Sequence, residues 1–451
     1  MLTRRGLLGG TCAAFISGRV RAEDRKRLKK SVEFRPYRPG KTLCPITCIT
    51  PDDGFYIHTF FDVCPWSPSQ RYLACLRIPT QDRPPEWRDQ ADVCIIDLKE
   101  RTIQTVYSTS AFGMQTGAQV QWGRTDRFVY FNDKTERAKG QATGIRLDWQ
   151  SGKAEELAGP VYAVAPDESA AISFNLSLIN HTQEGYGCAV APEHRLKLSS
   201  RAARDQGLWY TDLKTNRTRL LVSLAQVYEA MPDKDAHRGL DFYLFHSKFN
   251  PQGTRIMQVV RLRDPKQEIP SYSWSLLTTF RPDGSDIRMA IPWQKWSLGG
   301  NHPNWLPDGE RILMNLKIDK VMRLCVARYD GSDFHLVSKT LLGSGHPSFE
   351  KTMRYILTDA YPKEPMTLPN GEVPLRLIDT RTDRETTVAT IYTLGRQEQN
   401  MLRLDPHPAW NRNYEQVCFN GAPDGRRQLY IADVGKALVR NGDRSWNAEL
   451  F

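Results

Sequence analysis

Long apolar runs, cysteine motifs and basic stripes are all missing from this sequence. No apolar segment reaches the length that a helix needs to cross a bilayer, so no membrane span is expected in the mature chain. The nine cysteines match neither a zinc ribbon nor a redox motif. The formal net charge is +11, yet no recognition motif or stripe of lysine and arginine accompanies it, which argues against a nucleic-acid partner. Amphipathic helices longer than about three turns are also missing, except around residues 221–231.

The cysteines leave two states open. Cys44 and Cys48 could form a disulfide with each other, or one of them with Cys64, if the chain resides in an oxidising compartment. Four others sit within apolar strand patterns and are expected to be buried thiols: Cys75, Cys94, Cys325 and Cys418.

Residues 1–22 have the pattern of an export signal. Arg4 and Arg5 begin a twin-arginine pattern, a short apolar stretch follows, and Val20-Arg21-Ala22 fits a cleavage site. We therefore expect a mature chain in the periplasm or outside the cell, the alternative being a disordered basic N-terminus. Its positive charge would suit an acidic polysaccharide, although a generic solubilising surface would give the same charge.

The rest of the chain repeats one unit seven times. Each unit has a turn-like hexad that begins with an aromatic or apolar residue, then a strand, and most units add a second strand that ends in aspartate. Repeats about 40 to 85 residues apart, all strand and turn, predict a seven-bladed β-propeller with four-stranded blades around a central channel. No linker divides it, so residues 23–451 are expected to form one domain. The units begin at Trp66, Trp122, Val164, Phe249, Trp305, Phe349 and Trp410.

Two features of the sequence depart from the repeat, and each leads to a prediction. The third unit holds an insertion at about residues 175–207, and insertions in such folds commonly lie on the binding face. A strand near the N-terminus, from residues 32–37 or 55–61, is expected to complete the last blade and close the ring.

Four of the nine histidines share one place in four successive repeats, three residues before the first aromatic. In a propeller this register puts them at the start of the strand that lines the channel, so their imidazoles would converge and could bind a divalent cation. Asp405 lies two residues before one of them and would face the same way along a strand. The alternative is that each histidine is an ordinary turn residue bonded to nearby backbone. The four are His246, His302, His346 and His407.

Three of these segments resemble a known enzyme family. Residues 299–305, residues 345–348 with 358–361, and residues 403–410 look like those of the oligogalacturonate lyases and their propeller relatives. The resemblance implies a seven-bladed propeller that binds manganese through histidines and a glutamine. It implies that His302 and His407 are ligands and that His246 is the catalytic histidine.

The chain departs from that family at two ligand positions. Asp405 stands where the family has a histidine, and the family's glutamine falls on Leu402. His346 is expected to compensate as a ligand. These departures leave the metal open among Mn²⁺, which the resemblance favours, Zn²⁺ and Ca²⁺.

The front half is also similar to the propeller ulvan lyases, in residues 60–67, 117–122, 160–167 and 184–187. Those enzymes use histidine and tyrosine as base and acid, with an arginine at the uronate. By this resemblance Tyr186, in a Gly-Tyr-Gly turn, is a catalytic candidate, although it could equally be an ordinary loop residue.

Together these features predict a metal-assisted polysaccharide lyase that cleaves an acidic, uronate-containing oligosaccharide by β-elimination. His246 would be the base, and Arg261 would pair with the uronate carboxylate, unless Arg261 only forms a surface ion pair. The alternative is a non-catalytic propeller of the TolB type that binds or scaffolds other molecules in the periplasm. Carboxylates paired as in a hydrolase are not evident in the sequence.

Overall fold

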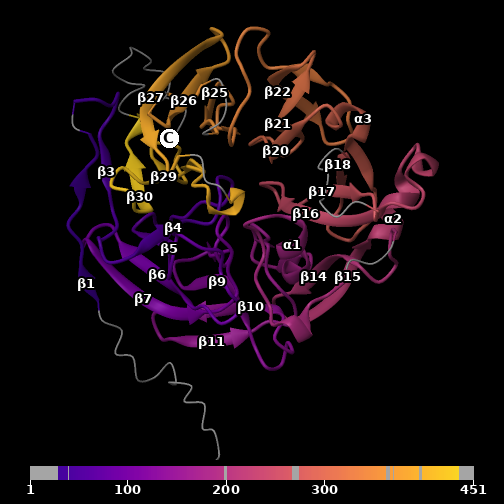
Figure 1. Ribbon diagram of the computed structural model, residues 1–451, viewed down its shortest axis with the longest axis horizontal. Helices are drawn as coiled ribbons and strands as arrows, with labels where there is room; N and C mark the ends of the chain where they lie inside the picture. Colours follow the sequence, from indigo (N-terminus) through magenta and orange to yellow (C-terminus); the bar gives the residue numbers. More distant parts are fainter. Residues whose placement is uncertain are drawn as a thin grey trace, which may run out of the picture.

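Seven antiparallel sheets stand around a central channel (Figure 1). This computed structural model confirms the predicted seven-bladed β-propeller. No helix in the part of the chain that it describes is long and apolar enough to cross a membrane. The predicted export signal, residues 1–22, lies outside the described residues, which are 29–38, 40–197, 201–266, 274–361, 366–368, 370–395 and 399–435.

The first four sheets follow one another along the chain, and in each, apart from the added outer strand β1, the strands run in sequence order from the channel outward. The strands of these sheets are β4 (Phe55–Ile57), β5 (Tyr72–Ile78), β6 (Ala91–Asp97) and β7 (Thr102–Thr109), with β1 (Lys30–Ser31) at the outer edge; β8 (Gln121–Trp122), β9 (Phe128–Lys134), β10 (Ala142–Asp148) and β11 (Lys153–Glu156); β12 (Ala163–Val164), β13 (Ala170–Ser173), β14 (Gly207–Asp212) and β15 (Arg217–Ser223); and β16 (Asp241–Phe249), β17 (Ile256–Arg263), β18 (Trp274–Phe280) and β19 (Arg288–Ile291).

The last three sheets complete the ring. They contain β20 (Gly300–Trp305), β21 (Arg311–Ile318), β22 (Val321–Arg328) and β23 (His335–Leu336); β24 (Ser348–Phe349), β25 (Tyr355–Thr358), β26 (Glu372–Asp379) and β27 (Arg384–Tyr392); and β28 (Ala409–Trp410), β29 (Val417–Gly421) and β30 (Gln428–Ala432), followed in the same sheet by β3 (Ile46–Cys48) and β2 (Arg35–Pro36).

The seventh sheet joins the two ends of the chain. Strand β3 pairs antiparallel with β30, and β2 pairs with β3. The closing segment is therefore residues 35–48, which overlap the first of the two predicted segments. The second candidate, around residues 55–61, instead begins the innermost strand of the first blade.

The aromatic residues of the repeat pack between neighbouring blades. The indole N–H of Trp122 donates to the Pro65 carbonyl at 2.9 Å, and that of Trp305 donates to the Lys248 carbonyl at 3.2 Å. Each acceptor belongs to the preceding blade. A buried tryptophan removes a large apolar area from water while its N–H is satisfied, so these residues hold adjacent blades together.

Helices occur only as short connectors in the described part. The helix expected around residues 221–231 is present but shorter, because residues 217–223 extend the strand β15. The insertion of the third blade holds a helix that begins at an asparagine cap, Asn175. The helices are α1 (Leu176–Thr182), α2 (Leu224–Ala230) and α3 (Trp293–Trp296), with 3₁₀ turns η1 (Pro192–His194), η2 (Lys234–His237) and η3 (Asn400–Leu402).

None of the eight described cysteines is part of a disulfide. The disulfides considered for Cys44, Cys48 and Cys64 are thus not formed. Cys75 and Cys94 face each other across β5 and β6, and both are buried, as expected from their apolar surroundings.

Candidate metal centre

Three of the four register histidines adopt a left-handed backbone. The φ angles of His246, His302 and His407 are 55°, 53° and 49°. Strand register shifts at His246 and again at His302, so each sits in a β-bulge of an innermost strand. A bulge re-aims a side chain, and positive φ at a non-glycine residue costs roughly 1–3 kcal/mol, a strain that commonly marks functional sites. The bulges explain how equivalent residues on successive blades turn inward together.

His346 joins the other three histidines with a different backbone geometry. The preceding Gly345 takes the positive φ of 62°, and a Cβ there would lie 2.2 Å from Asp359 Oδ1. Glycine thus allows Asp359 to approach the histidine. The carboxylate accepts from the His346 backbone N–H at 2.7 Å and from its ring Nδ1 at 2.9 Å. Because a carboxylate only accepts, Nδ1 carries the proton and Nε2 keeps a lone pair.

The four imidazoles lie close together. The rings of His302 and His346 stack with their centroids 3.9 Å apart, and His346 meets His407 edge-on at 4.4 Å. His246 lies farther from the other three histidines, with its ring centroid 6.4 Å from that of His302. The predicted convergence of the register histidines is therefore what the fold produces.

The four register histidines surround the channel in a group that we call the histidine ring. Phe60 fills the centre of this group. Its ring stacks on His246 at 5.0 Å and lies 4.7 Å from the ring of His407. Phe60 belongs to an excursion of the first blade: β4 ends at Ile57, and pairing with β5 resumes at Trp66. The intervening residues turn into the channel, with Val63 N–H donating to the Phe60 carbonyl at 3.1 Å.

Burial keeps most of these imidazoles neutral. The pKa of His246 is lowered well below its usual value by burial, and then by the charges of Lys248 and Arg261. Burial likewise lowers the pKa of His302 and of His407, and neighbouring histidines add to both effects. A neutral imidazole is the form that binds a metal or accepts a proton.

Several ligand atoms in this ring have no hydrogen-bond partner within the described part of the chain. They are Nε2 of His346, both ring nitrogens of His407, Nε2 of His246 and Oδ1 of Asp405. Buried polar atoms are rarely left unpaired without a reason such as an ion or a catalytic role. His302 differs, because its Nδ1 lies 2.7 Å from the Gly345 carbonyl and its Nε2 lies 3.2 Å from the Tyr361 hydroxyl.

His346, His407 and Asp405 fit a divalent cation. Their ligand atoms all lie within 4.8 Å of one another, and all three side chains are buried. Asp405 is held by Arg403, whose Nε donates to Oδ2 at 2.8 Å, and Oδ1 is left free to bind. Of the predicted ligands, these three come together as a set, and His302 packs against one of them.

Tyrosines and arginines surround the histidines. The Tyr162 hydroxyl shares a short hydrogen bond with His246 Nδ1. Tyr186, from the insertion, lies edge-on to His246 at 5.8 Å, and Arg403 Nη2 approaches its hydroxyl at 3.5 Å. Burial raises the pKa of Tyr186 to about 12, so its hydroxyl stays protonated at neutral pH.

Arg261 lies beside these tyrosines and histidines rather than on the solvent side. Its Nη1 donates to Gln183 Oε1 at 2.6 Å, and its guanidinium stands 4.7 Å from the Phe245 ring centroid. Its charge reaches His246, since it helps to lower the pKa of that imidazole. Arg403, which sequence reasoning did not single out, lies closer to the candidate ligands.

One more residue of the site escaped sequence reasoning. His58 starts the excursion of the first blade, and its ring lies 6.4 Å from that of His407. Burial lowers the pKa of His58 to about 4. No repeat marks it, because it stands eight residues before its aromatic. In the second blade the register position of the histidines is held by Gln119, which lies three residues before Trp122 and shares the positive φ, at 62°.

The comparison with solved structures agrees with this geometry at the level of the fold. A manganese complex of an oligogalacturonate lyase matches with a TM-score of 0.63 and 14% identity, covering 90% of this chain and 98% of its own. The oligogalacturonate lyase of Vibrio parahaemolyticus gives 0.61 and 13%, covering 91% and 98%. The fold is that of the oligogalacturonate lyases. TolB from Acinetobacter baumannii is less similar, with a TM-score of 0.38 and 9% identity, covering 81% and 82%.

Neither sequence comparison adds a relative. No family model matches the chain, and no curated protein matches it. The residue-level geometry of the histidine ring therefore has to carry the functional argument.

Proposed function

We propose that this protein is a divalent-metal-dependent lyase that acts on uronate-containing oligosaccharides. The observation that carries the proposal is the group of buried, unpaired ligand atoms of His346, His407 and Asp405 within 4.8 Å of one another. Imidazole nitrogens with one carboxylate suit Mn²⁺ or Zn²⁺ better than Ca²⁺, which prefers oxygen ligands throughout. When bound, such an ion supplies a Lewis acid for the uronate carboxylate.

The other residues have roles in β-elimination. His246 Nε2 has no partner in the described structure, so it can accept the proton α to the carboxylate. The C–H electrons then form the C4–C5 double bond, and the bond from C4 to the leaving oxygen breaks. The protonated Tyr186 hydroxyl can give that oxygen its proton. Arg403, which approaches the Tyr186 hydroxyl, and Arg261, whose charge reaches His246, can hold the carboxylate.

The chamber is closed in this conformation. The exposed fractions of His246, His302, His346 and His407 are 3%, 7%, 0% and 1%, and Tyr186 has 6%. A sugar could reach the imidazoles only if a covering side chain moved. Tyr186 is flanked by Gly185 and Gly187, whose φ angles of 85° and 68° give that turn a backbone few other residues adopt.

The same closure favours a second candidate function. A propeller whose histidine ring is packed around Phe60 could bind an ion for stability alone and serve as a non-catalytic binding or scaffolding module. The close packing of Phe60 against His407, 4.7 Å between ring centroids, is the observation in favour of it. The two candidates differ in activity and agree in metal binding.

One experiment separates them. Purified protein is analysed for divalent metal and then mixed with oligogalacturonate, and ultraviolet absorbance follows the unsaturated product. We expect about one ion per chain and a rise in absorbance. Metal without any elimination on pectic or ulvan fragments would favour the binding module, and absence of both would refute the metal centre.

The variant His246→Ala tests the assignment of the base. Removing a base should leave the metal in place and lower the elimination rate by about 10² to 10⁴-fold. His407→Ala is the matched comparison, since it should lose metal and activity together. If His246→Ala also lost the metal, His246 would be a ligand and the base would have to be another residue.

A further inference from the structure

The channel continues beyond the histidine ring into a cavity of about 600 Å³. The residues that follow each histidine along its innermost strand line this cavity, among them Lys248, Asn304, Ser348 and Trp410. Each residue of a strand advances roughly 3.3 Å along the channel. The cavity therefore lies farther from the mouth that holds the histidines and nearer the other mouth. None of the four register histidines is among its lining residues.

Two phenylalanines separate the cavity from the histidines. Phe60 and Phe61 both line the cavity, and on their other side they touch the histidine ring. The Phe61 ring lies 5.3 Å from that of His346, and the Phe60 ring lies 5.6 Å from it. A molecule in the cavity would therefore meet different side chains from a molecule at the histidines.

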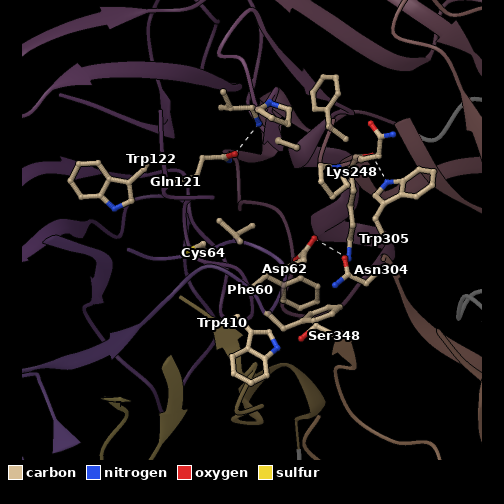
Figure 2. Close-up of a pocket in the computed structure, with 18 of the residues that line it drawn as sticks. Phe60, Asp62, Cys64, Gln121, Trp122, Lys248, Asn304, Trp305, Ser348 and Trp410 are labelled. Carbon is tan, nitrogen blue, oxygen red and sulfur yellow. Dashed lines mark hydrogen bonds and ion pairs between the residues drawn. The ribbon is translucent and has the colours of Figure 1, made fainter. Parts of the chain in front are cut away.

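An ion pair stands in the wall of the cavity, among aromatic and other polar side chains (Figure 2). Lys248 Nζ pairs with Asp62 Oδ2 at 2.9 Å and donates to the Pro303 carbonyl at 2.9 Å. Asp62 Oδ1 has no partner in the residues that the structure describes, and neither has the Ser348 hydroxyl. Figure 2 shows Asn304 next to the ion pair and Ser348 close by.

The chemistry of this wall selects a class of ligand. A carboxylate oxygen and a hydroxyl with unused capacity require hydrogen-bond donors and acceptors, which a purely apolar ligand does not offer. Lys248 is already neutralised by its ion pair with Asp62. The rings of Phe249, Phe349 and Trp410 offer apolar contact. A molecule with hydroxyls on its edge and C–H groups on its face meets both demands.

We propose that this cavity is a second binding site, for a short saccharide of one or two rings. Its volume lies within the roughly 300–1,000 Å³ of typical small-molecule sites. Hydroxyls of the sugar would donate to Asp62 Oδ1 and bond to Ser348 and Asn304. Arg124 and Arg412 also line the cavity, so an acidic sugar gains attraction that a neutral one lacks.

The test uses two probes, digalacturonate and the neutral disaccharide lactose, in calorimetric titrations of the full-length protein. Both should bind, digalacturonate more tightly. Asn304→Leu puts a branched apolar side chain into the polar part of the wall and should weaken both by at least about 10-fold. Asn304 is partly exposed, so this variant should fold, and its thermal melt checks this. Ser348→Ala, which removes only one hydroxyl, should weaken both probes to a smaller extent.

The control is Lys351→Leu, the same kind of change at an exposed position three residues after Ser348 and outside the lining. It should bind both probes as the wild type does. Absence of binding, or equal affinity in Asn304→Leu and the wild type, would overturn the second site. Loss of binding in His407→Ala alone would place the sugar at the histidines, which would refute this site and leave the proposed lyase function standing.

Discussion

The variant Asp359→Asn gives a sharp test of the metal centre, because it changes no ligand. In the wild-type protein the Asp359 carboxylate holds the proton on His346 Nδ1, with Oδ1 at 2.9 Å and Oδ2 at 3.0 Å from that nitrogen. This leaves the Nε2 lone pair for the ion. An asparagine keeps the shape but replaces one oxygen by an N–H donor, which would face a ring nitrogen that already carries a proton.

The expected magnitude follows from this geometry. Carboxylates that orient a ligating histidine contribute about 10- to 100-fold in metal affinity when replaced. That range corresponds to about 1.4–2.8 kcal/mol. Asp359 and His346 are both fully buried, so water cannot substitute for the lost hydrogen bond, and we expect the upper part of the range. Titration of chelator-treated protein with Mn²⁺ against a fluorescent competitor measures it.

Two comparisons make the result decisive. In a His346→Ala background, Asp359→Asn should lower metal affinity little further, because the interaction that it perturbs is already gone. Asp379→Asn alters a carboxylate of the same blade that pairs with Arg354 at 2.8 Å, and it should leave the affinity unchanged. An Asp359→Asn protein that binds Mn²⁺ as tightly as the wild type would refute the role given to His346.

Three further predictions concern stability. Asp319 and Lys320 form the tight turn between β21 and β22 with φ angles of 48° and 66°, so Lys320→Gly should raise the free energy of unfolding by about 1 kcal/mol in urea titrations; a lower midpoint would contradict this. A hydrogen bond from Arg255 at 2.9 Å lowers the pKa of Asp286, so its contribution is present above the unfolded pKa of about 4 and is lost as pH falls through the folded value. Asp286→Asn should therefore lower the melting temperature at pH 7 much more than at about pH 2, and equal losses would exclude the ion pair. Phe60→Ala should cost about 3–5 kcal/mol in denaturant unfolding, and a loss below about 1 kcal/mol would show that the ring of histidines does not depend on its filling.

The repeat register could be predicted from the sequence, because each strand-and-turn unit places equivalent residues at the same height along the central channel. It predicted the propeller and brought His246, His302, His346 and His407 to one region. The register could not reveal why they turn inward. That depends on bulges and left-handed backbone angles, which arise from pairing between strands rather than from any single residue.

The rest of the site lies where the repeat is broken. His58 and Phe60 occupy an excursion of the first blade that has no counterpart in the other units. Asp359 stands 13 residues after His346, at the end of another strand, and only the fold shows that the two meet. Arg403 likewise precedes the register histidine of its blade, and its Nε donates to Asp405 Oδ2.

Closure of the ring through β3 and β30 sets the order in which the histidine chamber can be assembled. The ribosome makes residues 46–48 and the Phe60 excursion well before His407 and β30. Until β30 has emerged, β3 lacks its partner and shows unpaired backbone groups that other strands could join. Under the proposed function, ion uptake can follow only once Asp405 and His407 have been made. A chain truncated before Asp405 would lack two of the three proposed ligands and the strand that pairs with β3.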